Sequence, residues 1–146
     1  MIEPTNTRPS VRPERRARDD APLRDLVQRI GHALIEGDTH AMARMWNVPS
    51  IAVSDRGVRV VLTPESTERF FRGEHQHHAA RGIIETLPDI QRVDWMTDRI
   101  VEVSVRWPHE DVHGHDLGAE LIRYTLRQDD AGEWKICAAV ARGSSH

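Results

Sequence analysis

Ala33-Leu-Ile-Glu-Gly-Asp38, followed by Trp46-Asn-Val-Pro49, decides how the chain begins to fold. In front of and inside the first stretch, apolar residues recur at three-to-four spacing, at Leu23, Leu26, Val27, Ile30 and Leu34. This spacing predicts a helix with one buried face that begins near Pro22. We expect Gly37 to end it, because glycine readily adopts the left-handed conformation of a helix C-terminus.

The residues that follow predict a short second helix and then a β-hairpin. Asp38 or Thr39 can cap the start of this helix, and we expect Pro49 to stop it because proline cannot continue a helix. Residues 51–53 and 58–62 are rich in β-branched side chains and flank four turn-like residues, which is typical of two paired strands.

The remaining chain predicts a third helix and a four-stranded meander. Thr63-Pro64-Glu65 combines a hydroxyl cap, a proline in the first turn and an acidic residue near the positive helix end, and the helix is expected to run to about Arg81. Strands are expected near residues 83–96, 99–108, 116–128 and 133–141. This order predicts an α+β fold, with the helices on one face of a mostly antiparallel sheet.

Composition limits the classes of partner. The chain has 146 residues, a net charge of −3 and a pI near 6.3. We therefore expect one domain, with no nucleic-acid partner and no membrane partner. It has no apolar run of membrane-spanning length and no signal-peptide pattern, so a cytoplasmic protein is expected. The one cysteine, Cys137, lies in a predicted strand and is expected to be buried and inert.

Both ends of the chain look unlike the middle. Residues 1–21 contain three prolines and five arginines but almost no large apolar side chain, which predicts a flexible arm. Its arginines are diluted by acidic residues, so a solvated arm is favoured over a nucleic-acid contact. Residues 22–142 are predicted to form the domain, and residues 143–146 are expected to be a disordered C-terminus or a tag remnant.

Several phrases in this order resemble the nuclear transport factor 2-like superfamily over roughly residues 22–141: residues 33–38, Trp46-x-x-Pro49, Thr63-Pro-Glu with Phe70-Phe71, and the closing Tyr124-Thr-Leu and Trp134-Lys-Ile. The resemblance implies a cone-shaped, cystatin-like fold, in which three N-terminal helices pack on a curved, mostly antiparallel sheet around a pocket. The superfamily includes ketosteroid isomerases, SnoaL-like polyketide cyclases, dehydratases and epoxide hydrolases, and members without assigned chemistry. The fold therefore leaves the function open.

The chain departs from the best-known chemistry of this superfamily. Ketosteroid isomerase-like members carry an oxyanion-stabilising tyrosine where this chain has Ile30, and a catalytic aspartate where it has Ser54. Asp55 is adjacent, but a shift of one residue along a strand turns a side chain to the other face. Asp94, Arg106 and Asp55 match the residue types of the epoxide hydrolase-like members, although no local motif connects them.

The third helix carries the strongest internal indication of a site. Phe70 and Phe71 are expected to face the sheet, and the same face continues through Glu74 to His77 or His78. A carboxylate one turn from an imidazole forms a candidate acid–base pair at the wide end of a pocket. The alternative, that this end of the helix simply leaves the sheet and is solvated, is favoured by the frequency of polar helix ends.

Further histidines raise the question of a metal site. His113-x-His115-x4-Glu120 matches part of a cupin metal motif, but the flanking glycines and the second half of that motif are missing. His109, His113 and His115 are predicted to lie at a hairpin tip, where ligands have no fixed geometry. We therefore expect no metal and no cofactor.

The outer face of the sheet is a candidate dimer surface. Glu102, Ser104 and Arg106 alternate with valines and are expected to point away from the helices. Glu120 and Arg123 on the neighbouring strand are expected to add cross-strand pairs there. A homodimer is predicted, with an ordinary solvated face as the alternative.

These observations predict a small-molecule-binding pocket protein, with acid–base catalysis of the isomerase, dehydratase, cyclase or hydrolase type on a small apolar molecule. The alternative is a non-catalytic dimerisation or interaction module whose pocket is filled by its own side chains. The candidate catalytic residues are Glu74, His78 and Asp55. The candidate ligand-binding residues are Trp46, Tyr124, His32 and Phe71, of which Trp46 also fits a core role and His32 also fits an exposed one.

Overall fold

The computed structural model describes residues 18–85 and 87–145 and has the predicted α+β architecture. Its three helices are α1 (Ala21–Glu36), α2 (Thr39–Met45) and α3 (Pro64–Ala80). Its strands are β1 (Trp46–Ser54), β2 (Gly57–Val61), β3 (Ile84–Glu85), β4 (Asp89–Trp95), β5 (Ile100–Glu110), β6 (Asp116–Gln128) and β7 (Trp134–Ser145). The helix–helix–hairpin–helix–meander order expected from the sequence is confirmed.

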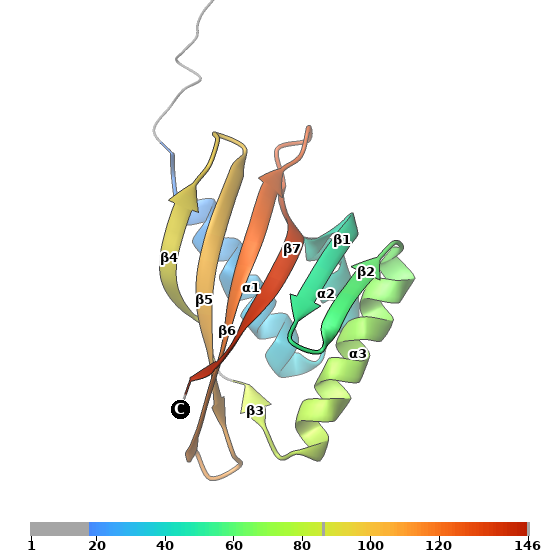
Figure 1. Cartoon of the computed structure of the whole chain (residues 1–146), viewed down its shortest axis with the longest axis vertical. Coiled ribbons are helices and arrows are strands. Elements are labelled where there is room, and N and C mark those ends of the chain that lie inside the picture. The colour runs from blue at the N-terminus through green and yellow to red at the C-terminus, as the bar shows by residue number, and fades with distance from the viewer. Residues whose placement is uncertain (1–17, 86, 146) are drawn as a thin grey trace, which may run out of the picture.

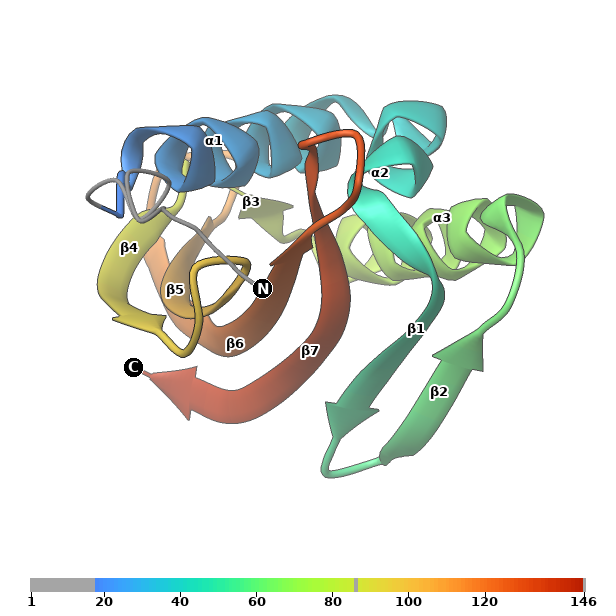
Figure 2. The same ribbon diagram turned by 90° about the horizontal axis from the view of Figure 1, so that it is seen from above.

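The strands form one curved, open sheet covered by helices on its concave side (Figures 1 and 2). The strand order is β2-β1-β7-β6-β5-β3, and β4 also pairs with β5. Strand β1 pairs with β7 in parallel, while the other described pairs are antiparallel. Helix α1 lies across the strongly curved part of the sheet, and α3 lies alongside the β1–β2 hairpin. The cone shape thus follows from a curved meander with a hairpin splayed away from it.

The Gly37-Asp38 step ends one helix and begins the next. Gly37 has φ 68°, the left-handed conformation expected of it, and the N–H of Asp38 donates to the carbonyl of Ala33 at 2.9 Å. The Asp38 carboxylate then accepts from the backbone N–H of Ala41 at 3.0 Å and caps α2. The sharp turn between α1 and α2 follows from these two residues.

The core lies between α1 and the meander. Leu23, Leu26, Val27 and Ile30 of α1 are at most 2% exposed, which confirms the predicted stripe. They pack in one cluster with the inward side chains of the sheet: Val101, Val103, Val105, Trp107, Tyr124, Leu126 and Ile136. Alternate residues of β5 are buried, so its outward residues lie on the convex face of the sheet.

Two predicted boundaries differ from the structure. Pro49 does not stop α2, because that helix already ends at Met45 and Pro49 lies inside β1. The strand tolerates it because pairing with β7 is irregular between Trp46 and Ile51 and pairing with β2 begins only at Ser50. The segment expected as one strand near residues 83–96 forms β3 and β4, which pair with different parts of β5.

The two ends of the chain are described in part. Residues 1–17 of the predicted arm and His146 lie outside the described residues. Arg18 pairs with Asp98 at 2.8 Å, and Asp20 accepts from the indole N–H of Trp95 at 3.0 Å, so residues 18–20 are held against the β4–β5 end. Residues 143–145 belong to β7 rather than to the disordered end expected from the sequence.

Strand β2 forms one edge of the sheet. Val58 and Val60 are 63% and 56% exposed, with Arg59 between them. The side chains of this apolar edge are therefore much more exposed than the inward side chains of the meander.

Candidate functional site

A cavity of about 480 Å³ lies between α3, the β1–β2 hairpin and the inner face of β5, β6 and β7. Helix α3 contributes Phe70, Phe71, Glu74, His77 and His78 to its lining. The sheet contributes Trp46, Ser54, Trp107, Glu120, Ile122, Tyr124, Ala139 and Ala141, among others. The small side chains of Ala139 and Ala141 leave room beside the larger Tyr124 and Ile122 that lie opposite them on β6.

The start of α3 sets the direction in which its cavity face points. The Thr63 hydroxyl accepts from the N–H of Ser66 at 3.0 Å, and the Ser66 hydroxyl accepts from the N–H of Thr63 at 3.1 Å. This capping box and Pro64 confirm the predicted helix start. From this start, the 3.6-residue period brings Phe70, Glu74 and His78 to one side of the helix.

One end of the cavity has an aromatic wall. Trp46 packs on Phe71 with ring centroids 5.2 Å apart, and Phe71 meets Phe70 edge-on at 5.0 Å. Behind them, Trp107 and Tyr124 meet edge-on at 6.4 Å. Such tilted and edge-to-face pairs are favourable aromatic contacts, so this end of the cavity is walled by packed rings.

Two indole donors belong to this wall. Trp46 and Trp107 are 4% and 2% exposed. Within the described residues, neither indole N–H has a hydrogen-bond partner. A buried donor without a partner costs about 1–3 kcal/mol, so the fold carries this cost at both indoles.

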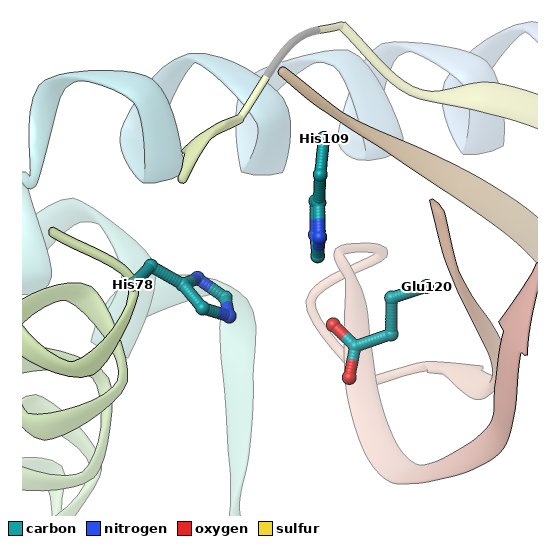
Figure 3. A group of neighbouring side chains, drawn as sticks. All are labelled: His78, His109 and Glu120. Carbon is teal, nitrogen blue, oxygen red and sulfur yellow. The ribbon is translucent and has the colours of Figure 1, made fainter. Parts of the chain in front are cut away.

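The other end of the cavity is ionisable. His78 lines it from the last turn of α3 and Glu120 from β6, while His109 of β5 lies beside them, and all three are half-buried. The rings of His78 and His109 have centroids 5.2 Å apart. One ligand atom from each of the three side chains lies within 4.8 Å of the others. Figure 3 shows the three side chains pointing into a common space between α3 and the sheet.

Five of the residues predicted from the sequence line this cavity: Trp46, Phe71, Glu74, His78 and Tyr124. The helical periodicity of α3 accounts for Phe71, Glu74 and His78, and the alternation of β6 accounts for Tyr124. Their roles in binding or catalysis stay predictions.

The structure does not bring Asp55 and His32 to this cavity. Asp55 lies exposed in the turn between β1 and β2, next to the cavity residue Ser54. His32 is exposed on α1 and lines a second hollow of about 880 Å³ with Arg29 and Glu36. A common site for these two side chains with His78 would need a change of conformation.

Two residues of this ionisable group were expected elsewhere from the sequence. His109 was expected at a hairpin tip, but β5 continues to Glu110 and holds His109 two residues beyond Trp107, on the same face. Glu120 was expected on the outer face, but it lies opposite the inward residue Trp107. The alternation from Tyr124 through Ile122 already leads to Glu120, so this signal was present in the sequence.

The histidines that remain at the hairpin tip are exposed. The Asp111 carboxylate accepts from the N–H of His115 at 2.9 Å, from the N–H of His113 at 2.8 Å and contacts the His115 ring at 3.0 Å. The backbone hydrogen bond from His115 lowers the pKa of Asp111 most, and the His115 ring and the N–H of His113 lower it further, against a raising effect of burial. The Asp111 oxygens are thus engaged in hydrogen bonds within the hairpin-tip loop.

The positions that carry the isomerase mechanism in ketosteroid isomerase-like proteins are apolar or neutral here. Ile30 is 2% exposed within the core and does not line the cavity. Ser54 lines the cavity, and its hydroxyl accepts from the N–H of Arg56 at 3.2 Å. Cys137 is no ready nucleophile, because burial raises the pKa of its thiol.

The family described as "NTF2-like protein (DUF6841)" matches residues 19–144. Comparison with curated proteins finds no match. In the described part of the chain, every helix is too short or too polar to cross a bilayer.

Solved structures share the fold at low identity. A domain of unknown function with a cystatin-like fold from Nostoc punctiforme is 13% identical, with a TM-score of 0.69 over 84% of this chain and 75% of that one. An NTF2-like protein from Novosphingobium aromaticivorans is 17% identical, with a TM-score of 0.65 over 84% and 80%. A structure from Catenulispora acidiphila in complex with S-DNPA is 15% identical, with a TM-score of 0.63 over 83% and 91%. These likenesses establish the cystatin-like fold.

Proposed function

The chain belongs to the NTF2-like family DUF6841, and from this premise we propose that it binds a small, largely apolar molecule between α3 and the sheet and acts on it by acid–base chemistry. The observation that carries the proposal is the cavity of about 480 Å³, which has an aromatic wall at one end and ionisable side chains at the other. Ligand pockets are typically of this size and this mixture of apolar walls with a few polar groups.

The proposed chemistry follows from the side chains at the polar end. Imidazole is the side chain best suited to give and take protons near neutral pH, which makes His78 the candidate acid–base group. Glu74 lies one turn earlier on the same face and is proposed to orient it. Proton transfer of this kind serves isomerisation, dehydration, cyclisation or hydrolysis. The apolar wall would hold the rest of the substrate.

Ligand binding in a protein of this fold adds support. The Catenulispora acidiphila structure of similar fold was solved in complex with S-DNPA. At 15% identity this likeness concerns the fold, so the ligand class for the present chain is argued from its own cavity.

Binding can be tested with 8-anilinonaphthalene-1-sulfonate, whose fluorescence rises in apolar pockets. Ala141 lines the cavity, whereas Val140 next to it is 40% exposed on the other face of β7. We expect Ala141→Phe to fill the cavity and to weaken binding of the dye at least about tenfold, the effect of about 1.4 kcal/mol. Val140→Phe is the matched control and is expected to bind like the wild type. Equal affinity of both variants would show that the dye binds elsewhere.

The catalytic part of the proposal needs its own experiment. Mass spectrometry of molecules retained through purification would identify a candidate substrate, which is then incubated with wild type and with a His78→Ala, Glu74→Ala double variant. We expect the double variant to bind this molecule and to lose its conversion. Unchanged conversion would remove His78 and Glu74 from the mechanism.

A non-catalytic dimerisation module is the second candidate, favoured by the apolar residue at position 30 and the serine at position 54. We propose a homodimer through the convex sheet face, where Arg123 pairs with Glu102 at 3.6 Å. Light scattering coupled to size exclusion would test it. A Ser104→Arg variant is expected to give monomers, and a wild-type monomer would refute this assembly.

A further inference from the structure

His78, His109 and Glu120 form a group of converging potential metal ligands, unlike the histidines at the hairpin tip. They come from three elements far apart in the sequence and converge on one space at the polar end of the cavity (Figure 3). His109 and Glu120 are held by adjacent paired strands, with Glu120 opposite Trp107 and His109 two residues further along β5. His78 closes the group from the last turn of α3.

We infer that these three side chains form a binding site for a divalent transition-metal ion of the Zn²⁺ type. The inference goes beyond the small-molecule proposal, because an ion can bind here whether or not an organic molecule fills the cavity. A bound ion would make His78 a ligand, so the acid–base role proposed for His78 applies to the metal-free protein. Within the described residues, this is the one group of three histidine, cysteine or acidic side chains with the required proximity.

The spacing of the ligand atoms fits an ion after a small closure. All three atoms lie within 4.8 Å of one another, so a point between them lies within about 2.8 Å of each, against roughly 2.0–2.2 Å for zinc bonds to histidine and carboxylate. Each ligand atom therefore has to move by less than an ångström. Rotation about side-chain bonds supplies a movement of this size while the two strands stay paired.

The donor types select the class of ion. Two imidazole nitrogens and one carboxylate oxygen suit Zn²⁺ and the neighbouring first-row transition metals, whereas Ca²⁺ and Mg²⁺ prefer sets made of oxygen alone. Three protein ligands leave at least one coordination position open, as in zinc sites that bind a water or a substrate. His78 and Glu120 line the cavity and His109 lies beside them, so an open position would be reached from the space that holds the organic molecule.

The surface histidines form the natural comparison. His113 and His115 are exposed at the hairpin tip, and the nearby Asp111 carboxylate is engaged by hydrogen bonds within the loop. His77 is exposed, one residue from His78 on α3. These residues supply matched controls. They are histidines close in sequence to the proposed ligands, but they do not point into the space shared by His78, His109 and Glu120.

The test uses the full-length protein without a histidine tag, freed of metal by a chelator, with Zn²⁺ and Co²⁺ as the only additions. Calorimetry is expected to show one Zn²⁺ bound per chain with a dissociation constant of about a micromolar or less. His78→Ala, His109→Ala and Glu120→Gln are each expected to weaken binding by at least about tenfold, since even outer-shell partners of metal ligands cost that much. His77→Ala and a His113→Ala, His115→Ala double variant are expected to bind like the wild type.

A second measurement avoids variants altogether and so does not depend on their folding. Paramagnetic Co²⁺ added to the wild-type protein is expected to broaden the amide signals of residues 109 and 120 before those of residues 113–115. Broadening first at the hairpin tip, loss of binding in the control variants, or no binding at all would each overturn the site. Dye binding in the cavity is measured without metal, so the failure of one proposal leaves the other standing.

Discussion

Replacing Ile30 by tyrosine restores the residue type that ketosteroid isomerase-like proteins carry at this position, and the structure predicts that it destabilises the fold. Ile30 is 2% exposed and packs in the core cluster with Leu26 and Val27 of the same helix. It does not line the cavity, so the larger ring has no open space to enter.

The size of the effect follows from two costs. Forcing a larger side chain into a packed core costs about 1–3 kcal/mol, and burying the tyrosine hydroxyl without a partner costs about 1–3 kcal/mol more. The free energy of unfolding is therefore expected to fall by about 2–6 kcal/mol. At roughly 3–4 °C per kcal/mol for a domain of this size, the thermal midpoint falls by about 6–24 °C.

Ile35→Tyr is the matched control, because Ile35 lies on the same helix but is 43% exposed. Its free energy of unfolding is expected to stay within about 0.5 kcal/mol of the wild type. Urea and thermal melts followed by circular dichroism measure both variants. If Ile30→Tyr were as stable as Ile35→Tyr, position 30 would open to the cavity, and the argument against an isomerase-like site would fail.

Other predictions test local features. Thr63→Ala removes the cap of α3 and is expected to cost about 1 kcal/mol in urea melts; an unchanged midpoint would contradict the role of the capping box. Gly31→Ala would place its Cβ 2.7 Å from Pro88 Cδ and is expected to destabilise by about 1–3 kcal/mol, whereas Gly73→Ala, with nothing within 4 Å, is expected to stabilise α3 by about 0.5–1 kcal/mol. The opposite order in the same melts would refute these two environments. Because burial raises the pKa of Cys137, its alkylation by iodoacetamide should be slower than in the unfolded chain and should still rise with pH after the unfolded rate has levelled; coinciding pH profiles would contradict the burial.

Much of the fold could be predicted because local signals agree with the tertiary structure. The apolar stripe around Ile30, the Gly37-Asp38 step and the Thr63 cap act within a few residues of themselves, and each appears as expected. The expectation that Pro49 stops α2 was wrong, because the effect of this proline depends on pairing between strands that are distant in the sequence. Because the register between β1 and β7 is irregular around Pro49, the strand loses no backbone hydrogen bond there. No residue near Pro49 in the sequence indicates this register.

Some residues of the candidate site could likewise be predicted from local sequence patterns, and others could not. Glu74 and His78 follow from the period of one helix, and Tyr124 follows from the alternation of one strand. His109 depends on how far β5 continues before its turn, and strand ends are set by pairing with a distant partner rather than by propensity. His109 and His78 lie close together only because the sheet packs against α3, so the local sequence around either residue does not predict their proximity.

The exposed edge at β2 has a consequence for the behaviour of the protein at high concentration. An edge strand presents backbone N–H and C=O groups that another extended chain can pair with, and Val58 and Val60 give such a contact apolar area to bury. Arg59 lies between the two valines, so two copies that meet edge to edge bring like charges together. Salt screens this repulsion, and aggregation through sheet extension is therefore expected to increase with ionic strength. We therefore expect Arg59 to oppose edge-to-edge association of β2.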